Sequence, residues 1–253
     1  MGADRNARRR SRGVAGPPLL AVFVGAAVAA CSTPPQPTPS GTRMSLHDET
    51  PSSAEPNTAY PTVRVVLGDS LGAVRDASTL PIANSPRATG ENIFVTTPAR
   101  LVYGPRDHTL ALPPGLFLSL VPMAGHVVEI RASPHLRALT LDEALALAER
   151  VGGLAAAGGW RRAQAVASSD SVRRALAALP PDASYKQVVD RWQYANGDEM
   201  FVSVQRTKSV ADVRAANAAF GTRTPERDQF LVDVYLTNGP VFERYAAIDR
   251  ARH

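Results

Sequence analysis

Residues 185–207 read YKQVVDRWQYANGDEMFVSVQRT and form the strongest local pattern in the chain. Two runs rich in β-branched and aromatic residues, 185–194 and 199–207, lie on either side of Asn196-Gly197. This dipeptide is typical of the tight primed turn that joins two antiparallel strands. The stretch therefore predicts a β-hairpin.

The segments beside this hairpin predict further elements. Apolar residues at every second position from Phe230 to Leu236 indicate another strand, and residues 241–252 indicate a closing helix. On the other side, residues 171–179 have helical spacing of apolar residues and stop at Pro180-Pro181, which cannot continue a helix. Helices and strands are thus mixed along this half of the chain.

A longer helix is predicted to begin after Thr140. Residues 140–143, Thr-Leu-Asp-Glu, match a capping box, in which the first and fourth residues bond each other's backbone N–H groups. Glycines are expected to end the helix, near either Gly152-Gly153 or Gly158-Gly159. The apolar face of this helix consists of Leu141, Leu145, Ala148 and Val151.

The first half of the body shows a similar order. Residues 62–67 predict a short strand ending at Gly68, after which Asp69 or Ser70 can cap a brief helix. A series of short strands separated by proline and glycine follows and predicts an antiparallel meander with one wet face. These strands are expected at 93–96, 101–103, 116–121 and 127–132.

This order of elements predicts an α+β fold with antiparallel sheets and helices. A helix followed by strands occurs twice, which suggests two repeated modules, 62–137 and 138–253. A single domain over 62–253 is the alternative.

The chain begins with the features of an export signal. Arginines cluster between Arg5 and Arg12, an uncharged segment covers 14–30, and small residues follow. The segment is too short, too rich in alanine and glycine, and too interrupted by Pro17-Pro18 to predict a transmembrane helix. Residues 1–30 are therefore interpreted as a signal peptide. Residues 31–61 contain seven prolines and few apolar side chains, and predict a disordered tether.

Val28-Ala29-Ala30-Cys31 resembles the lipobox of bacterial lipoproteins, and Cys31 is the only cysteine in the chain. The resemblance implies that the Cys31 thiol is acylated, that the peptide is cut before it, and that the new amino terminus is acylated too. Two or more fatty chains hold a protein stably at a bilayer, since each buried methylene contributes about 0.8 kcal/mol. Because Ser32 is not the aspartate that retains many such proteins in the inner membrane, the resemblance favours the periplasmic face of the outer membrane if the organism is Gram-negative.

The positive charge of the chain does not indicate a nucleic-acid partner. The formal net charge is +5, but residues 1–30 hold five arginines against one acid, Asp4. Without them, 23 basic residues face 22 acidic ones, for a net charge of +1. The remaining chain therefore lacks the basic excess typical of polyanion binders.

A second resemblance concerns the start of the body. Residues 67–71, Leu-Gly-Asp-Ser-Leu, with Val74-Arg75 and a following strand meander, resemble the opening of the small lipoprotein of the outer-membrane barrel-assembly machinery and related envelope modules. The resemblance covers about 70 residues. It implies binding to other envelope proteins rather than catalysis.

Gly68-Asp69-Ser70-Leu71 also resembles the nucleophile block of the GDSL, or SGNH, hydrolases, which implies Ser70 as an alternative catalytic residue. Such an enzyme also needs a base and oxyanion donors. The chain departs from the family, because it has no Gly-x-Asn-Asp block and because Asp249 and His253 are one residue too far apart. The other interpretation of Ser70 is a helix cap.

Other residue types give no catalytic or metal site. The histidines have no ligand spacing, Gly152-Gly153 and Gly158-Gly159 lack the Lys-Ser/Thr of a phosphate loop, and the acids near 142–149 fit a helix start. Trp160 and Trp192 are expected in the core rather than on an aromatic binding surface. We therefore expect no cofactor and no metal.

Together these patterns predict a lipid-anchored envelope protein that works by noncovalent contact. Exposed edge strands are plausible docking sites for an envelope protein partner. The alternatives are a serine esterase using Ser70 and a protein that binds a small ligand or inhibits an enzyme.

Overall fold

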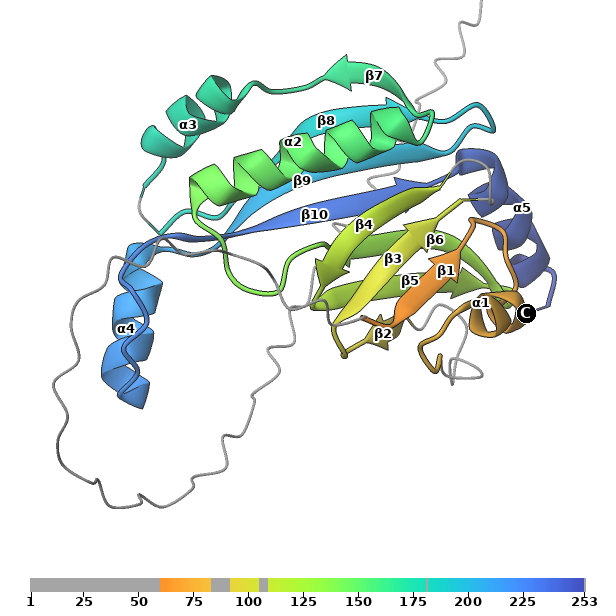
Figure 1. The fold of residues 1–253 in the computed structure, drawn as a ribbon, viewed down its shortest axis with the longest axis horizontal. Helices are drawn as coiled ribbons and strands as arrows, with labels where there is room; N and C mark the ends of the chain where they lie inside the picture. The colour runs from red at the N-terminus through yellow and green to blue at the C-terminus, as the bar shows by residue number, and fades with distance from the viewer. Residues whose placement is uncertain (1–59, 83–91, 105–108, 181, 253) are drawn as a thin grey trace, which may run out of the picture. The chain divides into compact units, whose positions relative to one another are not determined.

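The computed structural model describes residues 60–82, 92–104, 109–180 and 182–252. This part of the chain combines helices with two β-sheets whose strands pair mostly antiparallel, which confirms the α+β class (Figure 1). The signal segment, Cys31 and nearly all of the predicted tether lie outside the described residues.

The larger sheet has seven strands and is antiparallel throughout. Its last strand in sequence, β10, lies between β6 and β9, so the sheet continues across the suggested module boundary at 137/138. In spatial order the strands are β2 (Ile93–Val95), β5 (Phe117–Met123), β6 (His126–Ser133), β10 (Gln229–Thr237), β9 (Glu199–Lys208), β8 (Tyr185–Gln193) and β7 (Arg161–Ala165).

The smaller sheet has the order β1 (Thr62–Val65), β3 (Ala99–Tyr103), β4 (Leu110–Gly115). Strand β1 pairs parallel with β3, which differs from the antiparallel sheets expected of the fold. Strand β4 was not predicted, because Pro113-Pro114 argues against a strand. Its position at the sheet edge explains why prolines without N–H donors are tolerated.

The predicted hairpin is present as β8 and β9, but its turn differs from the expected type. The Gly197 N–H donates to the Tyr194 carbonyl at 3.0 Å. Gly197 has φ +90°, whereas Asn196 is not among the residues with positive φ. Both primed two-residue turns need positive φ at the first central position, here Asn196, so this connection fits a type I turn followed by a glycine bulge.

Helix α2 (Leu141–Ala157) begins as predicted and packs against one face of the larger sheet (Figure 1). The Thr140 hydroxyl accepts a hydrogen bond from the Glu143 N–H, and the Glu143 carboxylate accepts one from the Thr140 N–H, which confirms the capping box. The helix continues through Gly152-Gly153 and ends at Gly158, the later of the two expected positions.

Four further helices are present in the described residues. Helices α1 (Leu71–Ala77), α3 (Ser169–Ala177) and α5 (Gly239–Arg250) lie close to their predicted positions. Helix α4 (Val210–Phe220) was not predicted, and Val213 is its only buried residue. None of the helices in the described ranges combines the length and the apolar character needed to cross a bilayer.

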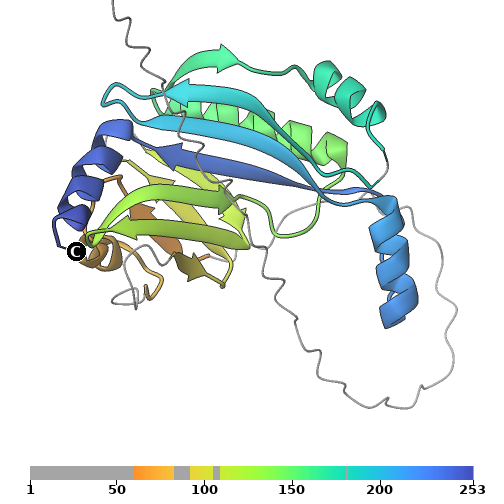
Figure 2. The same cartoon turned by 180° about the vertical axis from the view of Figure 1, so that it is seen from behind.

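Both sheets and α2 contribute to one apolar core. Trp160 and Trp192 are buried in it, as expected. The opposite face of the larger sheet has no described helix across its middle (Figure 2). There the Phe201 and Tyr235 rings lie 6.0 Å apart, and the Arg131 guanidinium lies 5.2 Å from the Tyr235 ring centre. The apolar core therefore lies on the α2 side of this sheet.

Candidate functional site

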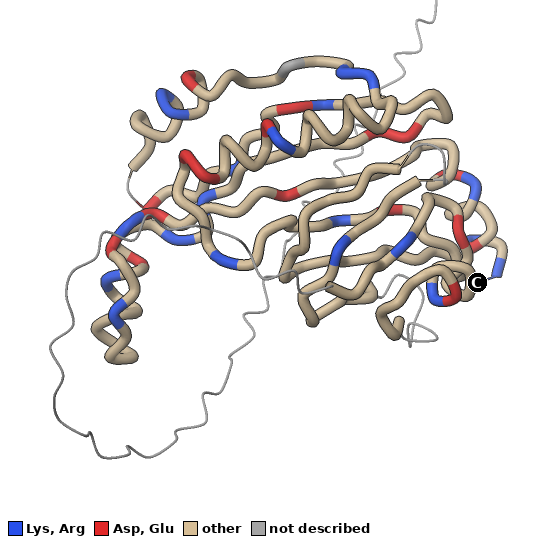
Figure 3. The backbone as a smooth tube through the Cα atoms, viewed as in Figure 1, with Lys and Arg blue, Asp and Glu red and all other residues tan. Residues whose placement is uncertain are grey.

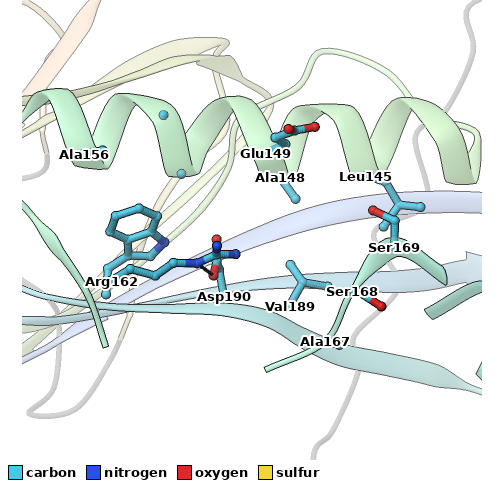
Figure 4. Close-up of a pocket in the computed structure, with 13 residues that line it drawn as sticks. Leu145, Ala148, Glu149, Ala156, Arg162, Ala167, Ser168, Ser169, Val189 and Asp190 are labelled. Carbon is cyan, nitrogen blue, oxygen red and sulfur yellow. Dashed lines mark hydrogen bonds and ion pairs between the residues drawn. The ribbon is translucent and has the colours of Figure 1, made fainter. Parts of the chain in front are cut away.

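A groove of about 450 Å³ lies between α2 and the end of the larger sheet formed by β8 and β7. Figure 4 shows Leu145, Ala148 and Glu149 on the α2 wall and Val189 and Asp190 on the opposite wall. The connection from β7 to α3, residues 166–168, closes one end. The groove thus joins elements from distant parts of the sequence.

Two adjacent glycines of α2 shape the groove. A Cβ atom at Gly152 would lie 3.1 Å from Trp192 Cζ2 and 3.2 Å from Asp190 Oδ2, so glycine allows the helix to approach the sheet closely. A Cβ atom at Gly153 would meet nothing within 4 Å. Gly153 also lines the groove, and its missing side chain leaves the space open.

An ion pair crosses the floor of the groove. Arg162 Nε donates to Asp190 Oδ1 at 2.6 Å, and the Asp190 side chain is only 9% exposed (Figure 4). The Arg162 guanidinium also lies 5.9 Å from the Trp192 ring centre, within the range of a cation–π contact. The pair neutralises the buried carboxylate and fixes the arginine beside the indole.

The indole N–H of Trp192 has no hydrogen-bond partner among the described residues, although its nitrogen is shielded from solvent. Trp192 is 7% exposed and lines the groove. A buried donor left without an acceptor costs about 1–3 kcal/mol. An occupant could recover this energy only if the side chains that cover Nε1 moved aside.

The rim of the groove carries one acid without an ion-pair partner in the described part of the chain, Glu149. The only other charged lining residues are Arg162 and Asp190, which neutralise each other. The groove therefore has a net charge of about −1 from these three side chains. Its electrostatics favour a positively charged group.

Strand β7 forms the outer edge of the sheet beside the groove. Arg162 pairs in register with Trp192, and both side chains face α2. A register shift between Arg162 and Gln164 marks a bulge. Among the described strands, β7 has a neighbour on one side only, so its other side presents backbone donors and acceptors.

Ser70 is the N-cap of α1, and its hydroxyl oxygen accepts a hydrogen bond from the Ala73 N–H at 3.2 Å. The backbone of Ser70 forms an isolated antiparallel β-bridge with the backbone of His126, which brings the two residues together. The His126 ring, however, bonds the Gly68 carbonyl through Nδ1 at 2.9 Å and stacks on Tyr245 with centres 4.2 Å apart. The local geometry gives Ser70 a capping role.

The other candidate residues are spread over the molecule. Asp142 and Glu143 lie in the first turn of α2, as expected for a helix start. Cys31, His47, His108 and His253 lie outside the described residues. In the described ranges, no group of three histidine, cysteine or acidic side chains has a metal-binding arrangement. Basic and acidic residues are interspersed along the elements (Figure 3).

Sequence reasoning did not identify the groove. Trp192 was assigned to the core, which is correct, but its unpaired N–H depends on which groups surround it. The Arg162–Asp190 pair joins residues 28 positions apart. The one sequence signal for the groove was Asp190, a charged residue at a position where the strand pattern of residues 185–194 predicts an apolar one.

Comparison of the chain with protein-family models, with curated proteins and with solved structures gives no significant match. The groove, the free edge of β7 and the amino-terminal sequence are therefore the features that bear on function.

Proposed function

We propose that this chain is a lipid-anchored cell-envelope protein that binds a partner protein noncovalently. The location is supported by the resemblance of residues 28–31 to a lipobox and by the signal-like residues before them. Cys31 is the proposed lipidation site, and the periplasmic face of an outer membrane is the proposed location. Binding is assigned to the groove between α2 and β8 and to the neighbouring edge of β7.

The groove, next to the free edge of β7, carries the binding proposal. A folded protein rarely leaves a buried donor without an acceptor, and Trp192, whose N–H has none among the described residues, lines this groove with Nε1 itself shielded from solvent. A carbonyl oxygen of a partner segment would reach Nε1 only if the side chains that cover it moved. The groove needs no reactive group for this role.

The edge of β7 supplies a second set of hydrogen-bonding groups for a partner segment. An extended segment that adds to a sheet edge gains main-chain hydrogen bonds, and its alternate side chains point to one face of the sheet. At β7 that face is the one on which Arg162 and Trp192 lie. A segment bound along β7 would therefore place every second side chain in the groove.

The charge of the groove indicates the type of segment. Glu149 has no ion-pair partner in the described part of the chain, while the Arg162 charge is already balanced by Asp190. A lysine or arginine of the partner would pair with Glu149. We therefore propose an extended, basic segment of an envelope protein as the occupant.

The decisive experiment fills the groove without disturbing the fold. Gly153→Leu places a side chain in open space, and Gly153→Ala is the matched control because one methyl group occupies little of the groove. The full-length protein is expressed in its own envelope, crosslinked and isolated from membranes. A specific partner should be recovered with the wild type and with Gly153→Ala, and lost with Gly153→Leu. Equal recovery with all three would refute the groove as the binding site.

The anchor is tested separately by mass spectrometry of the mature protein. A chain that begins at Cys31 and carries fatty acyl groups supports the proposed location. A free Cys31 thiol, or a different first residue, would overturn the location and leave the groove proposal unaffected.

A further inference from the structure

A second cavity, of about 690 Å³, lies on another side of α2. It is bounded by α2, by strand β4 and by the segment that leads from β6 to α2, residues 134–139. Its volume is within the roughly 300–1,000 Å³ typical of small-molecule sites. It shares no lining residue with the groove described above.

Nine of the thirteen residues that line the cavity are alanine, leucine or proline. Leu112 and Pro113 contribute from β4, Leu147 and Leu154 from α2, and Leu136 from the connecting segment. Leu112 belongs to the core, while Leu147 and Leu154 are only partly buried against it. These apolar side chains favour an aliphatic chain, because burial removes apolar surface from water.

The charged residues of the same cavity are all arginines. Arg100, Arg137 and Arg150 line it, and no aspartate or glutamate does. Arg137 forms an ion pair with Glu143 at 2.6 Å. Arg100 and Arg150 have no ion pair in the described part of the chain. Two unpaired guanidinium groups at an apolar cavity favour an anion, and their fork of donors suits a phosphate or a carboxylate.

His135 also lines the cavity, and one of its ring nitrogens lacks a partner among the described residues. His135 Nδ1 lies 2.7 Å from the Arg137 carbonyl oxygen and must donate to it, because a carbonyl oxygen only accepts. Its Nε2 is shielded from solvent and has no hydrogen-bond partner among the described residues. Because Nε2 is covered, a ligand in the cavity gains no hydrogen bond from it.

We infer that this cavity binds an anionic amphiphile, an aliphatic chain that carries a phosphate or carboxylate head. The aliphatic part lies against Leu136, Leu147 and Leu154, and the head lies between Arg100 and Arg150. This is a site of a different ligand class from the partner-binding groove, and it does not depend on that proposal.

The binding test uses the full chain in phosphatidylcholine nanodiscs and isothermal titration calorimetry. Octyl phosphate is the probe, and octyl glucoside and inorganic phosphate are the two controls, since each has only one of the two required features. Saturable binding of octyl phosphate, at least about tenfold tighter than either control, is expected from one charge-assisted contact. Equal binding of octyl glucoside would overturn the anionic head, and equal binding of inorganic phosphate would overturn the aliphatic chain.

Variants connect the binding to the cavity. Arg100→Gln and Arg150→Gln should each weaken octyl phosphate binding about tenfold. Arg223→Gln, at an exposed arginine that does not line the cavity, is the control and should bind as the wild type does. Leu136→Asp should abolish binding by placing an acid in the cavity, and circular dichroism should show an unchanged fold. Wild-type affinity in both arginine variants would overturn the site.

A last comparison identifies the source of the ligand. The titration is repeated in nanodiscs that contain phosphatidylglycerol. Weaker apparent binding of octyl phosphate there means that bilayer lipids compete for the cavity, and unchanged binding means that the ligand is a free amphiphile. Both results support the site.

Discussion

The Tyr103 hydroxyl donates a hydrogen bond to the carboxylate of Asp198 and thereby links the smaller sheet to the turn of the β8–β9 hairpin. The same carboxylate accepts hydrogen bonds from Asn196 Nδ2 at 2.8 Å and from Asn238 Nδ2 at 2.7 Å. Asn238 also caps α5. Since Asp198 is only 2% exposed, its charge is stabilised by these donors rather than by water.

Tyr103→Phe should lower the free energy of unfolding by about 1.5–3 kcal/mol, because a hydrogen bond to a charged group is lost inside the core. Burial and the nearby Asp198 carboxylate raise the pKa of Tyr103, so the hydroxyl remains a donor at ordinary pH. Urea unfolding measures the change. Asp198→Ala should cost more, because three donors lose their acceptor, and each buried donor left unpaired costs about 1–3 kcal/mol. A loss below about 0.5 kcal/mol in Tyr103→Phe would contradict this role.

Ser70→Ala should lower the free energy of unfolding by about 1 kcal/mol, the usual effect of removing a helix cap. Ser70→Asp retains an oxygen acceptor for the Ala73 N–H and should remain close to the wild type. Thermal unfolding of both variants checks this difference. An ester-hydrolysing activity of the wild type that both variants lose would show that capping is not the whole role of Ser70.

Local patterns predicted those elements whose signals lie within a few residues. The capping box of α2, the β8–β9 strands and the alternation in β10 all follow from neighbouring residues. The pairing of β10 with β6 joins residues about 100 positions apart, and no local pattern specifies it. Strand β7, with the sequence RRAQA, gave no strand pattern because an edge strand needs no apolar face.

The candidate site was less predictable than the fold for the same reason. The strand pattern of β8 predicts Trp192 as a core residue. Whether its indole N–H has an acceptor depends on the residues that surround it in the fold. Asp190 lies beyond a register shift between β8 and β9, which turns its side chain toward Arg162 and α2. Such a bulge depends on the partner strand and cannot be predicted from the alternation of one strand.

Gly197→Ala should lower the free energy of unfolding by about 1–2 kcal/mol, because an alanine at φ +90° brings its Cβ close to the backbone. Gly197→Asn is the matched variant, since asparagine tolerates positive φ better than alanine does. Thermal unfolding should rank wild type, Asn and Ala in descending stability. Equal stability of the two variants would argue against backbone strain as the cause.

Glu143→Gln should reduce the dependence of stability on acid pH. Hydrogen bonds from Arg137 and from the Thr140 backbone lower the pKa of Glu143 from 4.5 to about 2. A carboxyl group with a lowered pKa stabilises the fold above its unfolded pKa, and this contribution is lost as pH falls from 4.5 toward about 2. The partly exposed pair contributes about 1 kcal/mol after screening by solvent. Urea unfolding at several pH values across this interval measures the free energy of unfolding as a function of pH. This free energy should depend less steeply on pH in Glu143→Gln than in the wild type, and an identical dependence would contradict the assignment.

The adjacent glycines of α2 should respond oppositely to the same substitution. Gly153→Ala should raise the free energy of unfolding by up to about 1 kcal/mol, because alanine favours the helix and its methyl group meets no atom within 4 Å. Gly152→Ala gains the same propensity but places its methyl group 3.1 Å from Trp192 and 3.2 Å from Asp190. Because Trp192 is buried and Asp190 is held by Arg162, overpacking of about 1–3 kcal/mol should outweigh the gain. Parallel urea titrations measure both variants. Stabilisation by both alanines would show that α2 can move away from the sheet, and that the groove is wider in solution than the close approach at Gly152 implies.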